Sequence, residues 1–332
     1  MSDPLLRIED LHVSFFTHVG EVKAIRGVDL HVDAGESVGV VGESGSGKSV
    51  TSLAALRLLP YPGKITEGKL FFRGENLLEK SRRDMRAMRG NQISMIFQDP
   101  MTSLNPVFTI GDQIVEALAV HNKKKSRKAA RERAVEMLEL VGIPDAATRA
   151  RGYPHEFSGG MRQRAMIAMA LVCEPALLIA DEPTTALDVT IQAQILELMT
   201  DLRRKIGTSV LLITHDLGVV SETCSRVVVM YGGQIMEESP VEELFENPLH
   251  PYTRGLIRSL PMWGAPGERL APIPGTPPDL LSPPAGCPFV ERCPEAMKIC
   301  LEHRPDFYVQ NKHRAACWRL DPGCPSPGEN RL

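Results

Sequence analysis

The loop Gly42–Ser49 is the segment that most restricts how this chain can fold. It reads GESGSGKS, which fits the pattern G-x-x-x-x-G-K-[ST], and it directly follows the apolar run Ser37–Val41, which has the composition of a buried strand. Glycines let successive backbone N–H groups turn inward around phosphate oxygens, because a Cβ atom would block that approach. A strand, such a loop and a helix in this order predict a nucleotide-binding α/β fold.

This phosphate loop (Gly42–Ser49) carries the residues expected to hold a triphosphate. Lys48 supplies a point charge to the β and γ phosphates, and Ser49 offers its hydroxyl to Mg²⁺. The helix that begins here directs the positive end of its dipole at the nucleotide. The other loop residues expected to line the nucleotide are Gly42, Glu43, Ser44, Gly45, Ser46 and Gly47.

A second candidate site element is the apolar run ALLIADEP, which ends in Asp181 and Glu182. A carboxylate at the end of a strand can hold Mg²⁺, which is the role expected of Asp181. The adjacent Glu182 is placed to polarise an attacking water. Together with the phosphate loop, this pair predicts a nucleotide hydrolase. An acidic strand end that is merely exposed to solvent is the alternative.

The segment EFSGGMRQR, residues 156–164, places Ser158, Gly159 and Gly160 immediately before a helical pattern. The backbone N–H groups at such a helix start can bind a phosphate. Because Lys48 of the same chain already serves the γ-phosphate, this second set of donors would act on a nucleotide bound by another subunit. A simple helix cap is the alternative interpretation of Ser158.

The order of patterns along the chain predicts the arrangement of strands and helices. Short apolar stretches in residues 5–42 predict strands, and a helix is expected after Lys48. Residues 106–150 change to helical periodicity, which predicts a helical subdomain at about 99–165 inserted into the sheet domain. Strand and helix patterns alternate again over residues 176–235, which is typical of βα units on a largely parallel sheet.

Proline density marks the boundary between the two predicted domains. Nine prolines lie between Pro261 and Pro288, and no helix or central strand tolerates that density. We therefore expect a nucleotide-binding domain over residues 1–261 and a smaller module over 262–325. Residues 326–332 are expected to form a flexible tail.

Composition and charge restrict the possible partners of the chain and its possible location in the cell. A net charge of -3 and a pI near 6.3 give no basic footprint for nucleic acid, so none is expected as a partner. Seven basic residues lie between Lys123 and Arg133, and a solvated helix face accounts for them better than an acidic partner or lipid headgroups. No apolar run approaches the ~18 residues that span a bilayer, and the N-terminus lacks the features of a signal peptide. A cytoplasmic location is expected.

Five of the seven cysteines gather in the last 46 residues. A reducing compartment favours metal binding over disulfides for such a group. Four of them follow the pattern C-x5-C-x6-C-x16-C, and four thiolates can hold a structural Zn²⁺ or a [4Fe–4S] cluster. Because zinc sites usually show C-x2-4-C pairs and none occurs here, the spacing favours iron and sulfur, with zinc or free thiols as alternatives. The four candidate ligands are Cys287, Cys293, Cys300 and Cys317, with Cys324 left over.

The order of these motifs resembles that of the ATPase subunits of ABC transporters. Residues 5 to about 240 follow the family pattern, with Gln98 as the Q-loop glutamine, Asp188 at the end of the D-loop and His215 as the switch histidine. Phe15 matches the aromatic residue that stacks on adenine, and the neighbouring Phe16 leaves that choice open. The signature motif departs from the usual Leu-Ser-Gly-Gly-Gln, since it reads FSGGM.

This resemblance implies a P-loop NTPase fold with a RecA-like core and an N-terminal antiparallel β subdomain. It also implies a head-to-tail dimer, in which Lys48 and Ser49 face the partner's signature motif across ATP and Ser158 reciprocates. Glu182 would act as general base, His215 would contact the γ-phosphate, and Gln98 would sense Mg²⁺ and pass the change to membrane subunits.

The last part of the chain indicates a branch of this family. The segments NPLHPYTRGLIRSLP and GCPFVERCPEAMKIC resemble the C-terminal extension of D-type ATP-binding subunits of dipeptide and oligopeptide importers. In that family the extension carries a [4Fe–4S] cluster on four matching cysteines. Importers of nickel, glutathione and some sugars share it, and an ABC ATPase acting on nucleic acid or the ribosome, or a scaffold that binds ATP without turnover, is an alternative of another class.

The importer resemblance also implies partners and a place in the cell. The expected partners are a second, related ATPase chain, two membrane permease subunits and, indirectly, an extracytoplasmic substrate-binding protein. The chain is then expected at the cytoplasmic face of the inner membrane, as a peripheral subunit.

Overall fold

The computed structural model describes residues 3–98, 103–122, 126–185, 188–260 and 272–324. The chain divides into two compact units, each built from separate stretches of sequence. Unit 1 comprises residues 1–32, 37–78 and 213–332, and unit 2 comprises residues 33–36 and 79–212. The predicted flexible tail, residues 326–332, lies outside the described residues.

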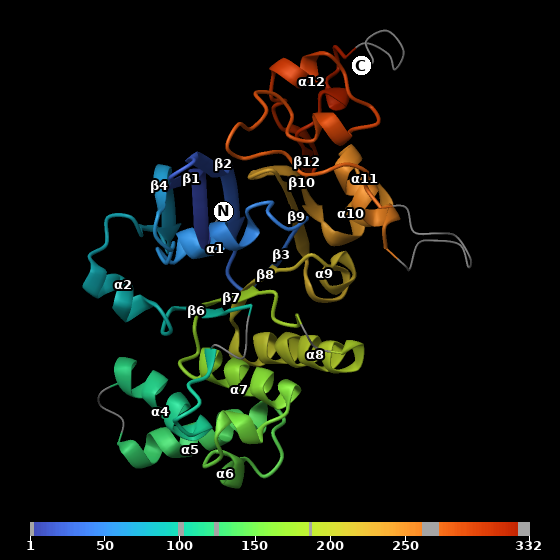
Figure 1. The fold of residues 1–332 in the computed structure, drawn as a ribbon. Coiled ribbons are helices and arrows are strands. Elements are labelled where there is room, and N and C mark those ends of the chain that lie inside the picture. Colours follow the sequence, from blue (N-terminus) through green and yellow to red (C-terminus); the bar gives the residue numbers. More distant parts are fainter. Residues whose placement is uncertain (1–2, 99–102, 123–125, 186–187, 261–271, 325–332) are drawn as a thin grey trace. The chain divides into compact units, whose positions relative to one another are not determined.

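The N-terminal part of unit 1 is an antiparallel sheet with the strand order β2-β1-β4-β5 (Figure 1). Its long strands alternate apolar and polar residues, so one face of the sheet is buried and the other is solvated. The predicted antiparallel β subdomain is therefore confirmed. The strands are β1 (Leu6–Thr17), β2 (Gly20–Val32), β4 (Gly63–Phe72) and β5 (Glu75–Asn76).

A second group of strands in unit 1 has the order β11-β12-β10-β9-β3. Strands β3 and β9 are parallel and almost entirely buried, which explains their runs of valine. The helices α1, α9, α10 and α11 belong to the same unit. The bounds are β3 (Ser37–Val41), α1 (Lys48–Ala55), α9 (Leu217–Thr223), β9 (Arg226–Tyr231), β10 (Gln234–Pro240), α10 (Val241–Glu246), α11 (Pro251–Arg258), β11 (Tyr308–Gln310) and β12 (His313–Ala315).

Strand β10 departs from the expected βα pattern, because it pairs with β9 in an antiparallel hairpin. The reason is the Gly232–Gly233 turn, in which both residues have positive φ angles of 55° and 78°. Two such residues form the tight turn whose twist matches a hairpin. On its other side β10 pairs with β12 of the cysteine-bearing segment. The segment therefore extends a sheet of unit 1 and covers what would otherwise be a free edge.

Polar and charged side-chain pairs within unit 1 tie the C-terminal segment to β10. His313 Nε2 lies 2.6 Å from Glu237 Oε1, and both side chains are buried. Arg314 donates to Glu238 at 2.5 Å, and Arg226 pairs with the same carboxylate. Such buried pairs are costly to break, because the remaining partner would be a desolvated charge. His313, which lies near the cysteines in sequence, is thus engaged by a carboxylate.

Unit 2 contains parallel strands and the predicted helical insertion. Strands β6 and β7 are parallel, and β8 lies next to β7 in the sheet. Helices α4, α5, α6 and α7 and the short 3-10 turn η1 lie between β6 and β7 in sequence. The bounds are α2 (Arg82–Met88), β6 (Ile93–Ile96), α4 (Ile110–His121), α5 (Arg127–Leu140), α6 (Ala146–Arg149), η1 (Pro154–Glu156), α7 (Gly159–Leu171), β7 (Leu177–Asp181), α8 (Val189–Ile206) and β8 (Ser209–Ile213).

The described part of the basic run lies on the solvated side of α5. Lys128 is exposed and forms an i,i+4 pair with Glu132, while Arg133 pairs with Glu136 and Glu174. The opposite face of α5 buries apolar residues such as Met137. This is the solvated-face arrangement that the charge pattern predicted. Across the described ranges, no helix combines the length and the apolar character that crossing a membrane requires.

Three shorter elements complete the C-terminal segment of unit 1. The turn η2 spans Val290–Arg292 and lies between two of the predicted cysteine ligands. Helix α12 spans Ile299–Glu302, and η3 spans Trp318–Leu320 directly after Cys317. Because the segment is short of regular structure, its fold depends on turns, on the pairing of β12 with β10 and on the side-chain cluster described next.

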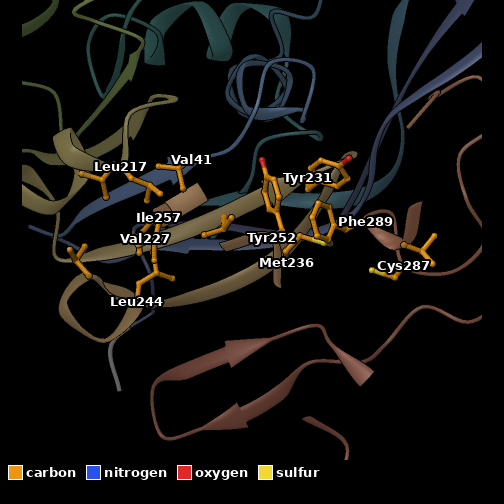
Figure 2. Packing of buried hydrophobic residues seen from close by; sticks show 14 residues of the cluster. Val41, Leu217, Val227, Tyr231, Met236, Leu244, Tyr252, Ile257, Cys287 and Phe289 are labelled. Atoms are coloured by element: carbon orange, nitrogen blue, oxygen red, sulfur yellow. The ribbon is translucent and has the colours of Figure 1, made fainter. Parts of the chain in front are cut away.

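A hydrophobic cluster in unit 1 joins the strands to the C-terminal segment. Tyr231 of β9 and Tyr252 of α11 pack their rings 4.6 Å apart, and Phe289 lies 5.3 Å and 5.2 Å from them (Figure 2). Cys287 belongs to the same buried group. Fully buried aromatic side chains contribute large apolar areas, so this cluster supplies a core for the segment that composition alone did not reveal.

Candidate functional site

Lys48 lies at the centre of the phosphate loop in unit 1. It is the first residue of α1, and its side chain is buried. Its Nζ donates hydrogen bonds to the carbonyl oxygens of Gly42 at 2.7 Å and Glu43 at 3.0 Å, and it lies 3.5 Å from Ser46 Oγ. The ammonium group is thus held inside the loop by backbone acceptors, which is the position expected for a charge that meets phosphate oxygens.

Two glycines let the phosphate loop pack against neighbouring strands. Gly42 has a φ angle of 151°, and a Cβ atom there would lie 2.1 Å from the carbonyl oxygen of Met230 in β9. Gly47 has a φ angle of 103°, and its Cβ would lie 2.6 Å from Ile25 Cδ1 in β2. The loop therefore depends on glycine for both its backbone angles and its close contacts.

We expect Gly42→Ala to lower the thermal unfolding midpoint of the chain strongly, because the new Cβ would overlap a backbone oxygen that cannot rotate away. Gly45→Ala is the matched control, since Gly45 has a φ angle of 79° but a methyl group added there would meet no atom within 4 Å. It should cost only the left-handed backbone strain of roughly 1–2 kcal/mol. Calorimetry of both variants measures the difference, and equal midpoints would contradict the contact argument.

Glu43 has an unexpected set of partners. Its backbone N–H donates to Tyr252 Oη at 2.9 Å, and its carboxylate forms a two-pronged ion pair with Arg292 at 2.5 Å and 3.0 Å. The ion pair with Glu43 raises the pKa of Arg292 above its usual value. Burial raises the pKa of Tyr231 and Tyr252. Sequence reasoning placed Glu43 in the nucleotide site but identified neither Tyr252 nor Arg292 as its partner.

In unit 2 the structure brings Gln98 and Glu182 together. Glu182 directly follows β7, which ends at the buried Asp181. Its carboxylate oxygen Oε2 accepts hydrogen bonds from Gln98 Nε2 at 3.0 Å and from Thr185 Oγ1 at 2.8 Å. Glu182 has a left-handed φ angle of 46°, a conformation that costs energy and clusters at functional sites. Thr185 is a partner that the sequence motifs did not indicate.

The signature segment lies at the start of α7 in unit 2. Ser158 is its N-cap, and its Oγ accepts a hydrogen bond from Met161 N at 3.3 Å. Ser158 and Gly159 are exposed, and Gly160 faces α8, where Ile191 Cγ2 would lie 3.0 Å from a Cβ added to this glycine. The capping role proposed as an alternative is thus present. It leaves the first N–H groups of the helix directed outward at the exposed end.

The remaining predicted nucleotide residues lie at the ends of elements. Asp188 caps α8 by accepting from Ile191 N at 3.0 Å, and residues 186–187 before it lie outside the described part. His215 is exposed and follows β8. Phe15 is half-buried, with its ring against Gly63, whereas Phe16 is 46% exposed with Lys64 Nζ 5.6 Å from its ring centre.

The predicted residues divide between the two units. Unit 1 contains Phe15, the phosphate loop and His215. Unit 2 contains Gln98, the signature segment, Asp181, Glu182 and Asp188. Within each unit the structure places these residues at the ends of strands or the starts of helices. The phosphate loop thus belongs to unit 1, whereas the acidic pair Asp181–Glu182 belongs to unit 2.

The four predicted metal ligands form one group in unit 1, in which each thiol is close enough to interact electrostatically with the other three. Burial raises the pKa of Cys287 and Cys317 to about 12 and that of Cys293 to about 11, and it also raises the pKa of Cys300. The sulfur of Cys324 lies 3.6 Å from Met297 Sδ.

Backbone groups surround these four sulfur atoms. Each sulfur interacts with a backbone N–H, and three of these donors follow their cysteine by two residues. Among the described residues, no three of the thiols have all their sulfur atoms within 4.8 Å of one another. The donors are the N–H groups of Phe289, Glu295, Met297, Cys300 and Arg319.

Two family models match this sequence. One, described as ABC transporter, matches residues 25–185, and the other, described as Oligopeptide/dipeptide transporter, C-terminal region, matches residues 236–300. The dipeptide transport ATP-binding protein DppD of Bacillus subtilis is 54% identical over 321 residues, which cover 96% of each chain. The chain belongs to the ABC transporter family. The oligopeptide transport ATP-binding protein OppD of the same organism is 56% identical over 97% of this ABC transporter chain and 90% of the relative.

Solved structures agree with this family. The dimeric post-hydrolysis state of an ATP-binding cassette bound to ADP and Pi has a TM-score of 0.64 and 26% identity. The match covers 71% of this ABC transporter chain and 98% of the chain in the solved structure. The predicted P-loop NTPase fold is thereby confirmed. The first family model spans the phosphate loop, Gln98, the signature segment and the Asp181–Glu182 pair, while the second spans three of the four predicted cysteine ligands.

Proposed function

We propose that this chain is the ATP-binding and ATP-hydrolysing subunit that powers an importer of dipeptides or oligopeptides. The observation that carries the proposal is the similarity to peptide transport ATP-binding proteins along nearly the whole chain, extension included. A match to the ATPase domain alone would leave the class of transporter open, because many transporters share that domain. The match to the C-terminal region is what favours peptides over other cargo.

The roles proposed for the nucleotide residues follow from their chemistry. Lys48 and the phosphate-loop N–H groups bind the triphosphate, and Ser49 and Asp181 hold Mg²⁺. Phe15 stacks on adenine. Glu182 orients and polarises the attacking water, and His215 contacts the γ-phosphate. The hydrogen bond from Gln98 to Glu182 supports a link between the Q-loop and the general base, since a movement of Gln98 would alter the contacts of that carboxylate.

A second copy or a related chain completes the proposed site. The exposed Ser158 and Gly159, with the partly buried Gly160 beside them, are suited to meet a neighbour's γ-phosphate, and Asp188 lies at the exposed start of α8. A dimeric cassette among the similar structures supports this assembly. ATP binding then closes the dimer and hydrolysis reopens it, driving two permease subunits that receive cargo from an extracytoplasmic binding protein. The proposed location is peripheral, at the cytoplasmic face of the membrane.

Transport in a reconstituted system tests the proposed cargo. The chain is combined with its permeases and partner ATPase in proteoliposomes that enclose ATP and Mg²⁺. The substrate-binding protein and a labelled dipeptide are added outside. We expect labelled peptide to accumulate inside and the ATPase rate to rise. Accumulation of nickel or glutathione, with no response to dipeptides, would contradict the peptide proposal while leaving the ATPase role intact.

We also propose that Cys287, Cys293, Cys300 and Cys317 hold a [4Fe–4S] cluster, with zinc as the alternative. Sulfur atoms around one tetrahedral zinc lie roughly 3.8 Å apart, since each Zn–S bond is ~2.3 Å. The described thiols are spread more widely than such a site, and a four-iron cluster suits wider spacing because iron and sulfide atoms lie between the ligands. Backbone N–H groups at each sulfur also favour a thiolate-bound group. The cluster would join the loops of a segment poor in regular structure.

We expect the protein purified without oxygen to be brown and to contain about four iron and four acid-labile sulfide atoms per chain. Replacing Cys287 with serine should abolish that content and lower the thermal midpoint. Cys324→Ser is the matched control, because Cys324 contacts Met297 and is not one of the four proposed ligands. Iron and sulfide assays with the visible spectrum measure the result. Colourless protein with one zinc per chain would overturn the choice of cluster.

A further inference from the structure

Arg292 is the most completely engaged cation in the described part of unit 1. Its side chain is 4% exposed. The Nε–H donates to the carbonyl of Pro274 at 2.8 Å, and the two terminal nitrogens donate to the carbonyl of Ile273, to Tyr231 Oη and to the two carboxylate oxygens of Glu43. These contacts use all five N–H donors of a guanidinium group. A side chain held so fully has one conformation.

On one side Arg292 acts on the phosphate loop. The carboxylate of Glu43 accepts two hydrogen bonds from Arg292, while the carbonyl of the same residue accepts from Lys48 Nζ at 3.0 Å. The backbone N–H of Glu43 is held by Tyr252. Each polar group of Glu43 thus has a fixed partner. The second residue of the loop cannot turn without breaking a charge-assisted pair, and those are the strong hydrogen bonds of proteins.

On its other side Arg292 belongs to the cysteine-bearing turn. It is the last residue of η2 (Val290–Arg292), and the next residue is Cys293. The turn is closed by hydrogen bonds from Arg292 N to the Phe289 carbonyl and from Cys293 N to the Val290 carbonyl. The rings of Tyr231 and Phe289 pack beside the guanidinium, whose central carbon lies 5.6 Å and 5.9 Å from their centres. The fold of this turn therefore sets the position of the guanidinium.

The charge of Glu43 requires an explanation, because a carboxylate in a loop that binds a triphosphate repels its ligand. Like charges repel more strongly in a partly buried loop than in water, because the effective dielectric constant is lower there. The guanidinium of Arg292 compensates the charge of the carboxylate, so the ion pair as a whole is neutral. The pair also anchors the loop. The ion pair removes the repulsion and keeps the rigid attachment.

We propose that Arg292 is a positioning residue for nucleotide binding. It neutralises Glu43 and fixes the start of the phosphate loop, and so it links the folding of the cysteine segment to the affinity of the loop for ATP and Mg²⁺. This role for Arg292 depends on the proposed function in one respect, which is that the phosphate loop binds ATP. It concerns residues 43 and 292 and holds whichever metal the cysteines bind.

A double-variant cycle tests this proposal. The dissociation constant of ATP with Mg²⁺ is measured by calorimetry for the full chain and for Arg292→Gln, Glu43→Gln and the double variant. We expect Arg292→Gln to weaken ATP binding about tenfold or more, because an uncompensated carboxylate remains beside the phosphates. The double variant should recover to within about threefold of the parent. The loss in Arg292→Gln should also shrink as salt rises, since salt screens that charge.

Arg254→Gln provides the matched control. Arg254 pairs with Glu295 at 2.9 Å in the same cysteine segment but contacts no residue of the phosphate loop in the described contacts. This variant should leave the ATP dissociation constant unchanged. Metal content and thermal midpoints measured on every variant separate a loss of fold from a loss of affinity. A purely structural role for Arg292 predicts no recovery in the double variant and no dependence on salt.

The possible outcomes separate this inference from the proposed function. If the parent chain does not bind ATP, the proposed function fails. If the parent binds ATP and Arg292→Gln binds it equally well, or if the double variant stays as weak as Arg292→Gln, the positioning role is wrong and the ATPase proposal stands. Should Arg292→Gln not fold, Arg292→Met with and without Glu43→Gln gives the same comparison, because methionine fills part of the buried space and also leaves Glu43 without a counter-charge.

Discussion

Glu182→Gln is expected to bind ATP with nearly parental affinity but to hydrolyse it about a hundredfold or more slowly. The amide keeps the shape of the side chain and can still accept the hydrogen bonds from Gln98 and Thr185. It cannot take a proton or carry the negative charge that polarises a water, and general-base groups typically contribute 10²–10⁴-fold to rate. Steady-state phosphate release and equilibrium nucleotide binding, both on the purified chain with its ATPase partner, measure the two effects.

Glu174→Gln is the matched control for this experiment. Glu174 also belongs to unit 2, and its carboxylate pairs with Arg133 of α5 on the surface. Losing one exposed ion pair costs roughly 0–1 kcal/mol of stability and should leave turnover unchanged. A Glu182→Gln chain that hydrolyses ATP at the parental rate would remove Glu182 from the role of general base. Loss of ATP binding in this variant would point instead to a structural role for the carboxylate.

Local sequence patterns predicted the nucleotide elements of the fold well. The phosphate loop follows a buried strand and begins a helix, as its glycines and Lys48 require. Alternating apolar and polar residues predicted the N-terminal strands. The helical spacing of apolar residues over 106–150 predicted the helical insertion. The grouping of four cysteines follows from their crowding in one short segment. In each case the information lies within a few residues along the chain, so a pattern could reveal it.

The features that sequence did not reveal depend on contacts between distant segments. Glu43 and Arg292 are 249 positions apart, and no local pattern indicates that they meet. The hairpin of β9 and β10 was missed because a run of valines suits both parallel and antiparallel strands, and Gly232 and Gly233 decided the outcome. Thr185 was missed for another reason, since a threonine near a strand end usually has no role in chemistry.

Two kinds of constraint thus meet at the phosphate loop. The glycines and Lys48 are demanded by the geometry of phosphate binding, which any chain with this motif must satisfy. The partner of the Glu43 carboxylate, Arg292, comes from a C-terminal segment that the motif does not require. Tyr231 and Tyr252 contact Arg292 and the loop residue Glu43, respectively. Their rings pack together, Tyr252 Oη accepts from Glu43 N, and Tyr231 Oη accepts from Arg292. The extension is therefore part of the nucleotide-binding unit rather than an addition to its surface.

Lys48→Ala is expected to weaken ATP binding roughly a hundredfold, or about 2.7 kcal/mol. The ammonium group is buried within the loop, and a unit charge about 4 Å from a phosphate charge is worth roughly 4 kcal/mol at an effective dielectric constant near 20. Alanine also removes the Lys48 donor from the Gly42 carbonyl, and it leaves the Glu43 carbonyl with only the Ser46 N–H as donor. Calorimetric titration with ATP and Mg²⁺ measures the loss of affinity, and turnover should fall below detection at ordinary nucleotide concentrations.

Two further variants separate the charge of Lys48 from its packing. Lys48→Met keeps most of the buried stem and should lose nearly as much affinity as alanine, with a smaller fall in thermal midpoint. Lys128→Ala removes an exposed lysine of α5 and should leave ATP binding unchanged. If Lys48→Met bound ATP as tightly as the parent, the ammonium group would have no part in holding phosphate. The loop would then bind nucleotide through its backbone N–H groups alone.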